Sequence, residues 1–358
     1  MTIFGLSFMA RKQGLALLIK SFIVAGAFSA LRAHADTYSL PPGGGVVGAI
    51  TVASSEYEDT IPDIAYVYDQ GFTEMRLANP NVDAWIPGRD TEIIIPSQYV
   101  LPEAPREGIV INVPEMRLYY YPRAKPSEPA VVITHPLSVG RQDLRTPIGL
   151  NKVVAKVVDP PWYPPETIRE EHAADGDILP KMVPPGPDNP LGRYALRLAH
   201  GSYLIHWTNK PYGIGMRVTH GCLRLYPKDI ESLYSMVPVG TPVHIVNQPF
   251  KLGWLNGVLY LEVHPYLDEE EGSVPDDFTN LSGRITTLAQ AAGLAVDWDQ
   301  VQKIVSEKTG IPTAITGAGS QITETVQTEL LTNEGMEPET IRPEPTESSP
   351  DSSSPYGF

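Results

Sequence analysis

The chain has 358 residues, which is enough for two or three domains, and its formal net charge is −15. A chain this acidic is a poor nucleic-acid binder, so we exclude nucleic acid as a partner. It contains a single cysteine, Cys222, which excludes a fold held by intrachain disulfides.

The N-terminal segment has the pattern of a secretory signal peptide. Arg11 and Lys12 precede an apolar run, residues 15–30, and a small-x-small cleavage site follows at residues 33–35. The apolar run is shorter than the roughly 20 residues of a membrane-spanning helix, and a lysine interrupts it. We therefore predict that residues 1–35 are a signal peptide cleaved after Ala35. Cleavage removes four positive charges and no acid, so the formal charge changes from −15 to −19.

Residues 48–96 predict a strand, two helices and a second strand. β-branched residues favour a strand over residues 48–53, and helical spacing predicts one helix from Thr60 to Gly71 and a second that begins at Thr73 and stops before Asn79. The second helix ends before Pro80 because a residue that precedes proline avoids the helical conformation. Residues 92–96 form the closing strand.

This unit resembles a LysM module in its motifs Asp59-Thr60, Leu77-Ala78-Asn79-Pro80-Asn81, Pro87-Gly88 and Ile95-Pro96-Ser97. The resemblance implies a peptidoglycan-binding module over residues 38–100 that binds N-acetylglucosamine-containing glycan. The alternative is a spacer that packs on the rest of the protein.

The middle of the chain predicts mainly β-structure. After a proline-rich linker, residues 100–107, a hairpin is expected at 109–113 and 117–121. Further strands are expected at 130–134, 150–158, 194–199, 203–206 and 241–246, with one helix at 227–236. Many short strands joined by proline- and glycine-rich turns predict a β-sandwich or a barrel-like domain.

The C-terminal part predicts a mixed extension, residues 248–328, to which the sequence assigns no role. It contains an expected strand at 258–263 and expected helices at 281–292 and 298–308. Residues 329–358 are rich in acidic residues, proline and serine, which predicts a disordered acidic tail.

The surroundings of Cys222 indicate a catalytic thiol, because a free thiol needs a base or a positive field beside it to act as a nucleophile. His206 ends a strand-like run, and the glycine-containing loop that follows can turn the chain back so that His206 faces Cys222. His220 lies two residues before the thiol, on the same face of an extended chain. Gly221 removes side-chain bulk beside the sulfur, which leaves its backbone N–H free for an oxyanion hole. Arg224 adds a positive charge.

A zinc site is the alternative interpretation, with His200, His206, His220 and Cys222 as ligands. Zinc sites that use cysteine generally contain several, and the sequence has no His-Glu-x-x-His motif. We predict no metal and no cofactor.

Residues 203–225, with Thr219-His220-Gly221-Cys222 near their end, resemble the catalytic motif of the YkuD family of L,D-transpeptidases. Further matches are Ser138-Val-Gly140, Arg145-Thr-Pro-Ile-Gly149, Pro161-Trp-Tyr-Pro-Pro165 and Pro185–Gly192. The resemblance implies a β-sandwich catalytic domain over residues 108–247, and the order of segments resembles the periplasmic ErfK/YbiS group of Gram-negative envelope enzymes. Trp207 departs from the pattern, because many members carry glycine there, so acceptor fit or the orientation of the histidine ring is expected to differ.

The resemblance also implies roles for the residues. Cys222 is the expected nucleophile, His206 the general base, His220 a residue that shapes the site and assists the oxyanion, Gly221 an oxyanion-hole backbone donor, and Arg224 a group that meets a substrate carboxylate or braces the loop. Further cations that could bind the carboxylates of the substrate are Arg141, Arg145 and Arg217.

The implied reaction forms a Cys222 thioester with a peptidoglycan tetrapeptide stem and releases D-alanine. An amine then takes the acyl group, which gives a 3-3 crosslink or attaches a lysine of an envelope lipoprotein. The alternatives are an L,D-carboxypeptidase or other hydrolase that uses the same thiol, and a non-catalytic wall-binding protein.

Overall fold

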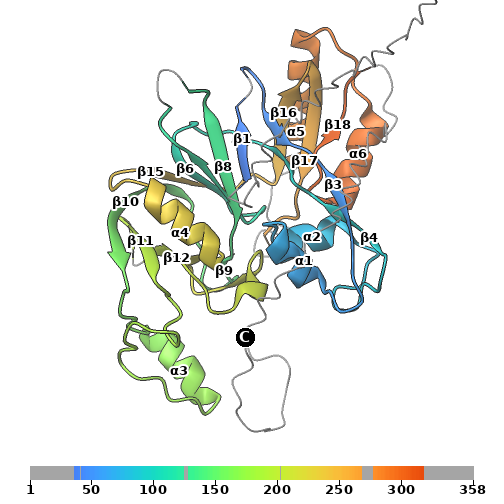
Figure 1. Cartoon of the computed structure of the whole chain (residues 1–358). Helices are drawn as coiled ribbons and strands as arrows, with labels where there is room; N and C mark the ends of the chain where they lie inside the picture. The colour runs from blue at the N-terminus through green and yellow to red at the C-terminus, as the bar shows by residue number, and fades with distance from the viewer. Residues whose placement is uncertain (1–35, 41, 125–127, 202, 268–276, 318–358) are drawn as a thin grey trace, which may run out of the picture. The chain divides into compact units, whose positions relative to one another are not determined.

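The computed structural model describes residues 36–40, 42–124, 128–201, 203–267 and 277–317 (Figure 1). The predicted signal peptide and the predicted acidic tail lie outside these residues. Within the described ranges, no helix combines the length and the apolar character that crossing a membrane requires.

The largest element is a curled sheet of nine strands in the order β1-β8-β7-β6-β15-β10-β11-β12-β14. Neighbouring strands are antiparallel except for the pairs β6–β15 and β12–β14, which are parallel. The prediction of a mainly β protein is confirmed at this level. The strands are β1 (Asp36–Ser39), β6 (Gly108–Asn112), β7 (Arg117–Tyr121), β8 (Val131–Pro136), β10 (Gly149–Val158), β11 (Tyr194–Leu198), β12 (Leu204–His206), β14 (Leu223–Arg224) and β15 (Pro242–Val246).

The core of this part lies between the sheet and helix α4 (Pro227–Met236), which covers one face of it (Figure 1). Alternate residues of each strand point into the core, as Ile109 and Ile111 do on β6. Ile230 and Leu233 of α4 are fully buried against them. Burial of each such side chain contributes about 1.5–3 kcal/mol, so this core fixes the register of the strands that carry the site.

The predicted strand, helix, helix and strand unit is present near the N-terminus. Strands β3 (Thr51–Ser54) and β4 (Glu92–Ile95) pair antiparallel, and helices α1 (Ile61–Val67) and α2 (Phe72–Ala78) pack on them around buried Met75. Thr60 and Asp63 form a reciprocal capping box that starts α1. Two further strands, β2 (Val46–Gly48) and β5 (Gln98–Val100), pair outside this unit, and the sequence did not predict them.

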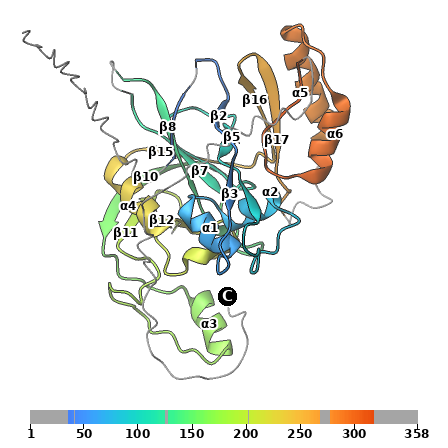
Figure 2. The same ribbon diagram turned by 45° about the vertical axis from the view of Figure 1, so that its right-hand side comes forward.

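The C-terminal part has a sheet and a core of its own. Strands β16 (Phe250–Leu255), β17 (Val258–Val263) and β18 (Thr313–Ala314) form the sheet, and helices α5 (Asp277–Ala291) and α6 (Trp298–Glu307) lie against it (Figure 2). Both predicted helices are present. Strand β16 was not predicted, because Lys251 and Gly253 interrupt its apolar pattern.

Helix α3 (Glu166–Ala174) lies beyond the ends of β10 and β11 in both views (Figures 1 and 2). None of its residues is buried, so it has no apolar face for periodicity to reveal, and the sequence analysis missed it. Three short elements complete the region, the parallel strands β9 (Val139–Gly140) and β13 (Arg217–Thr219) and the 3-10 helix η1 (Pro211–Gly213).

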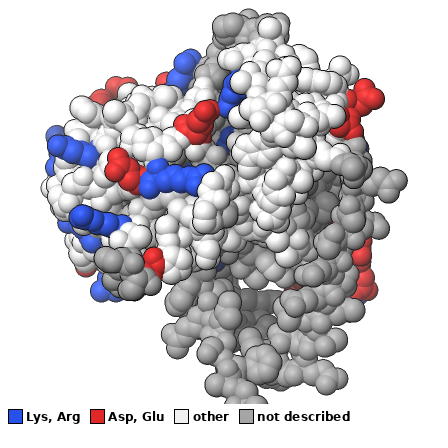
Figure 3. All heavy atoms as spheres, turned by 90° about the horizontal axis from the view of Figure 1, so that it is seen from above, with Lys and Arg blue, Asp and Glu red and all other residues white. Residues whose placement is uncertain are grey.

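On the face that Figure 3 shows, lysine and arginine side chains gather toward one side and are interspersed with acidic ones, while further acidic side chains lie at the opposite edge. The negative net charge is therefore not spread evenly over the described surface.

Candidate active site

The parallel pairing of β12 and β14 brings the chain segment of the predicted base alongside that of the predicted nucleophile. In this register Ile205 lies opposite Leu223, and His206 lies opposite Arg224. Ile205 and Leu223 are fully buried in the core. Because strand residues alternate between faces, His206 and Arg224 share the other face. Cys222 directly precedes β14, and the backbone of Leu204 and the charge of Arg224 act on its thiol.

The loop that connects His206 to Cys222 is held at several points. Ser138, which follows β8, exchanges two backbone hydrogen bonds with Arg224 (2.9 and 3.1 Å), and its hydroxyl donates to the carbonyl of Gly213 (2.7 Å). The backbone N–H groups of Phe72 and Thr73, at the start of α2, donate to the carbonyls of Ile214 (2.8 Å) and Gly215 (3.2 Å). The N-terminal unit therefore supports the same loop.

Hydrogen bonds from two threonines set the backbone at the nucleophile. The Thr219 hydroxyl donates to the carbonyl of Cys222 (2.6 Å), and the Thr146 hydroxyl donates to the carbonyl of Gly221 (3.1 Å). Gly221 has φ +95°, and a Cβ there would lie 2.6 Å from Cε1 of Tyr203. Both the backbone conformation and the space therefore require glycine at this position.

Two sequence-based expectations change with this backbone. The N–H of Gly221 donates to the Thr219 hydroxyl (3.2 Å), so it is not free as it stands, and a role as oxyanion donor requires it to leave this partner. Because Gly221 has a positive φ, residues 220–222 are not extended. The expected placement of His220 and Cys222 on one strand face therefore does not follow from a β-pleat.

Burial controls the electrostatics of His206 and Cys222. It lowers the pKa of His206 to about 3, and the charge of Arg224 lowers this pKa further. The backbone carbonyls of Trp207 and Pro190 act in the opposite direction and raise it. Burial also raises the pKa of the Cys222 thiol. The backbone of Leu204 and the charge of Arg224 lower this pKa, but by less. At neutral pH the site therefore holds a neutral thiol and a neutral imidazole rather than an ion pair.

Arg224 is the cation that acts on both groups. Burial lowers the pKa of this guanidinium, and its Nε atom has no hydrogen-bond partner in the described part of the chain. His206 Nδ1 is likewise buried and has no hydrogen-bond partner in the same residues. The site thus presents one unsatisfied donor on a cation and one unsatisfied ring nitrogen.

His220 is directed to a carboxylate that the sequence analysis did not identify. Its Nε2 lies 2.9 Å from Oε2 of Glu171 on α3, and the other oxygen of Glu171 accepts a hydrogen bond from Arg141. Arg141 and His220 lower the pKa of Glu171. Helix α3 therefore contacts the segment that carries the nucleophile, but its polar sequence gives no signal of this contact.

The remaining predicted residues occupy different places. Arg217 Nε donates to the carbonyl of Gly140 (3.3 Å), and Arg145 Nε donates to the carbonyl of Gln142 (3.3 Å). His200 is exposed. The ring of Trp207 packs on Gly192, where a Cβ would lie 2.3 Å from Cε3 of the indole, so the tryptophan depends on this glycine.

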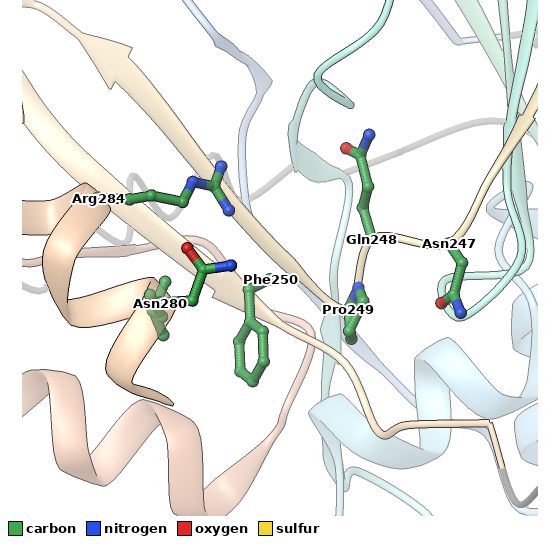
Figure 4. Close-up of a pocket in the computed structure, with 7 residues that line it drawn as sticks. Asn247, Gln248, Pro249, Phe250, Asn280 and Arg284 are labelled. Carbon is green, nitrogen blue, oxygen red and sulfur yellow. The ribbon is translucent and has the colours of Figure 1, made fainter. Parts of the chain in front are cut away.

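A pocket of about 150 Å³ lies away from these residues (Figure 4). Arg284 and Asn280 of α5 line one side of it, and the segment between β15 and β16 lines the other. None of the predicted site residues contributes to it, and we assign it no role.

Comparisons with known proteins agree with the motif. Residues 106–245 match the YkuD family model, described as the L,D-transpeptidase catalytic domain. The chain is 40% identical over 291 residues to the probable L,D-transpeptidase YcfS of Escherichia coli K12, with 79% of this chain and 89% of that protein covered. It is 38% identical over 304 residues to the probable L,D-transpeptidase YbiS of the same strain, with 83% and 96% covered.

Solved structures of lower identity also match. The catalytic domain of the Enterococcus faecium L,D-transpeptidase is 21% identical, with a TM-score of 0.30 and 40% of this chain and 100% of that chain covered. L,D-transpeptidase 3 of Mycobacterium tuberculosis is 18% identical, with a TM-score of 0.29 and 58% and 97% covered. The identification rests on the sequence relatives, whose identity and coverage show that the chain belongs to the YkuD family of L,D-transpeptidases.

Proposed function

We propose that this L,D-transpeptidase uses Cys222 as its nucleophile and His206 as its general base on a tetrapeptide stem of peptidoglycan. The observation that supports the proposal is the parallel register of β12 and β14, in which His206 pairs with Arg224, two residues after Cys222. The charge of Arg224 acts on both the thiol and the imidazole. No other cysteine is present in the chain.

In the first half of the reaction His206 takes the thiol proton as the sulfur attacks the carbonyl of the third stem residue. The bond to the terminal D-alanine breaks, and the amine of the departing D-alanine takes the proton from His206, which leaves a thioester on Cys222. In the second half an acceptor amine attacks the thioester, His206 accepts the proton of that amine, and the proton returns to the thiolate. Since the resting pair is neutral, proton transfer accompanies the attack.

The oxyanion that forms at the attacked carbonyl needs donors. We assign this role to the backbone N–H groups of Gly221 and Cys222, with the Gly221 N–H released from Thr219. His220, held by Glu171, shapes this side of the site, and Arg224 meets a substrate carboxylate with the donor that is unsatisfied in the described residues.

The N-terminal unit is proposed to be a LysM-like module over residues 38–100 that binds the glycan strand. Support comes from large apolar side chains on its loops, since Tyr57, Trp85 and Ile86 are 74%, 54% and 76% exposed. Trp85 also stacks on Phe72 of α2 (centroids 6.0 Å apart), which fixes an indole face of the kind that packs on sugar rings.

The organisation of the whole chain completes the proposal. A cleaved signal peptide, residues 1–35, would deliver the protein to the periplasm, where peptidoglycan is found. Residues 108–247 would form the β-sandwich catalytic domain. The extension, residues 248–328, and the acidic tail, residues 329–358, carry no assigned chemistry.

Intact mass spectrometry with a muropeptide tetrapeptide tests the mechanism. The chain is expected to gain the mass of the tripeptide acyl group, with loss of D-alanine, and the Cys222→Ala variant is expected to gain none. A chain that forms no adduct while its fold is intact would rule out Cys222 as the nucleophile.

The same experiment identifies the acceptor. Transfer of the adduct to a second stem peptide indicates 3-3 crosslinking, and transfer to the lysine of a lipoprotein peptide indicates anchoring. Loss of the adduct to water at the same rate with and without amines would instead favour the carboxypeptidase alternative.

A further inference from the structure

A buried cluster away from Cys222 brings together three side chains that are far apart in sequence. Asp69 lies in the turn after α1, His135 in β8, and Asp229 in the first turn of α4. Their side chains are 8%, 0% and 1% exposed. One ligand atom from each lies within 4.8 Å of the others. The cluster uses no residue of the proposed catalytic mechanism.

The distances in this cluster are longer than usual for hydrogen bonds between charged groups. His135 Nδ1 lies 3.5 Å from Oδ2 of Asp69 and 3.4 Å from Oδ1 of Asp229, whereas such bonds are usually about 2.7–2.9 Å long. Three other histidines of the described chain approach a carboxylate at 2.7, 2.9 and 2.6 Å, namely His172, His220 and His264. His135 is therefore the exception, although its ring is fully buried.

Most of the polar side-chain atoms of the cluster are also unsatisfied in the described residues. Both ring nitrogens of His135, both carboxylate oxygens of Asp69 and Oδ2 of Asp229 are buried and make no hydrogen bond. Lys228 Nζ lies 3.5 Å from Oδ1 of Asp69 and is partly exposed. Buried carboxylates without hydrogen bonds are costly, so a cation is expected between them.

In a second buried cluster, a lysine side chain supplies the cation between two carboxylates. Glu115 and Glu262 enclose the ammonium group of Lys251, with N–O distances of 2.8 and 2.6 Å, and His264 contacts the same oxygen of Glu262 at 2.6 Å. The lysine supplies the cation of that cluster, whereas the ammonium group of Lys228 is 3.5 Å from Oδ1 of Asp69 and its side chain is 35% exposed.

We propose that Asp69, His135 and Asp229 form a structural site for a divalent transition metal, with Zn²⁺ as the best fit. Tetrahedral zinc holds imidazole nitrogen and carboxylate oxygen at about 2.0–2.2 Å, which separates neighbouring ligands by about 3.3–3.5 Å. The distances from Nδ1 to the two oxygens, 3.4 and 3.5 Å, match this separation. A water molecule would supply the fourth ligand.

Asp69 delivers its carboxylate from a turn in which it has a left-handed backbone (φ +55°), a conformation uncommon for non-glycine residues. The metal would tie the N-terminal unit, β8 and α4 together.

The site goes beyond the proposed transpeptidase function, and its test does not depend on activity. The untagged full chain is stripped of metal, given ZnCl₂ and dialysed, and its zinc content is measured by mass spectrometry. About one zinc per chain is expected. X-ray absorption at the zinc edge of the same sample should show nitrogen and oxygen neighbours and no sulfur.

Variants locate the metal. Asp69→Asn and Asp229→Asn should each weaken zinc binding by about 100-fold or more and abolish the rise in Tm that zinc produces. Cys222→Ser and His172→Gln should keep full zinc content, since the first removes the thiol and the second removes a surface histidine–carboxylate pair.

Three results would overturn the proposal. One is a folded chain that takes up no zinc at micromolar concentration, which would mean that an imidazolium of His135 fills the cluster. Another is loss of zinc in Cys222→Ser, and the third is a sulfur neighbour in the absorption spectrum, both of which would place the metal at the thiol. Should an aspartate variant fail to fold, the absorption spectrum of the unaltered chain still decides between these cases.

Discussion

The pKa of His206 lies far below the usual value for a histidine. Burial lowers this pKa to about 3 and raises the pKa of Cys222. The base is therefore available in its neutral form well below the usual histidine value of about 6.5.

The rate of Cys222 acylation is thus expected to stay constant as the pH falls from about 8 to about 5, because neither group titrates in this window. Single-turnover acylation with a tetrapeptide donor, followed by intact mass, measures the rate at each pH. A decline centred near pH 6.5 would show that His206 titrates as an exposed histidine and would contradict the structure.

Arg224 supplies the charge that partly offsets the burial of the thiol. Its replacement in Arg224→Gln should raise the pKa of Cys222, and alkylation by iodoacetamide at fixed pH should slow about tenfold for each unit of that rise. Arg197→Gln is the matched control, because Arg197 is exposed on the neighbouring strand β11. Equal alkylation rates in the two variants would show that Arg224 has no electrostatic effect on the thiol.

At the scale of the elements, the loop between β12 and β14 depends on close contact with α2. Gly215 has φ +83°, and a Cβ there would lie 2.5 Å from Cα of Gly71. Gly176 has nearly the same φ, +84°, but a Cβ there would have no neighbour within 4 Å. Alanine substitutions at the two glycines therefore distinguish the effect of backbone strain from the effect of steric contact.

Gly176→Ala is expected to cost about 1–2 kcal/mol of unfolding free energy from backbone strain alone. Gly215→Ala should cost about 1–3 kcal/mol more and should also slow acylation, because the loop must move away from α2. Urea denaturation and the acylation rate measure the two effects. If Gly215→Ala loses no more stability than Gly176→Ala, the contact between the loop and the N-terminal unit does not support the site.

The sequence predicts a helix or a strand where buried apolar side chains recur with the period of that element. Helices α1, α2, α4, α5 and α6 and strand β4 have buried residues on one face, and the sequence predicted them. Helix α3 buries nothing and β16 carries a buried lysine, so both break the pattern and were missed. The thiol and its histidines stand in one local motif, whereas Glu171 reaches His220 only through the tertiary fold, so no local signal predicted it.

At the scale of the whole molecule, buried charges connect regions that have separate apolar cores. Lys251 of β16 contacts Glu262 of β17 and Glu115, which lies in the turn between β6 and β7. The second oxygen of Glu262 accepts a hydrogen bond from the backbone N–H of Val100 (2.6 Å). The C-terminal sheet is thereby joined to the large sheet and to β5 through groups that are at most 1% exposed.

Lys251→Met is expected to lower the free energy of unfolding at pH 7 by about 3–5 kcal/mol, because it leaves two buried carboxylates without their cation. In the unaltered chain Lys251 overcomes the effect of burial and holds the pKa of Glu115 below its usual value, so this carboxylate contributes stability at neutral pH that is lost as the pH falls. Without the lysine, burial raises the pKa of Glu115 instead, so this carboxylate is more easily protonated as the pH falls. The loss of unfolding free energy in Lys251→Met should therefore be smaller at pH 5 than at pH 7. Urea denaturation at both pH values measures the change.

The double variant Lys251→Met, Glu262→Gln is the matched control, since it removes one of the two stranded charges and should recover part of the loss at pH 7. A deficit that is equal at both pH values and unchanged in the double variant would mean that the lysine acts through packing alone. A loss of unfolding free energy that is smaller at pH 5 and is partly recovered in the double variant would mean that this ion network joins the C-terminal extension to the sheet that carries the active site.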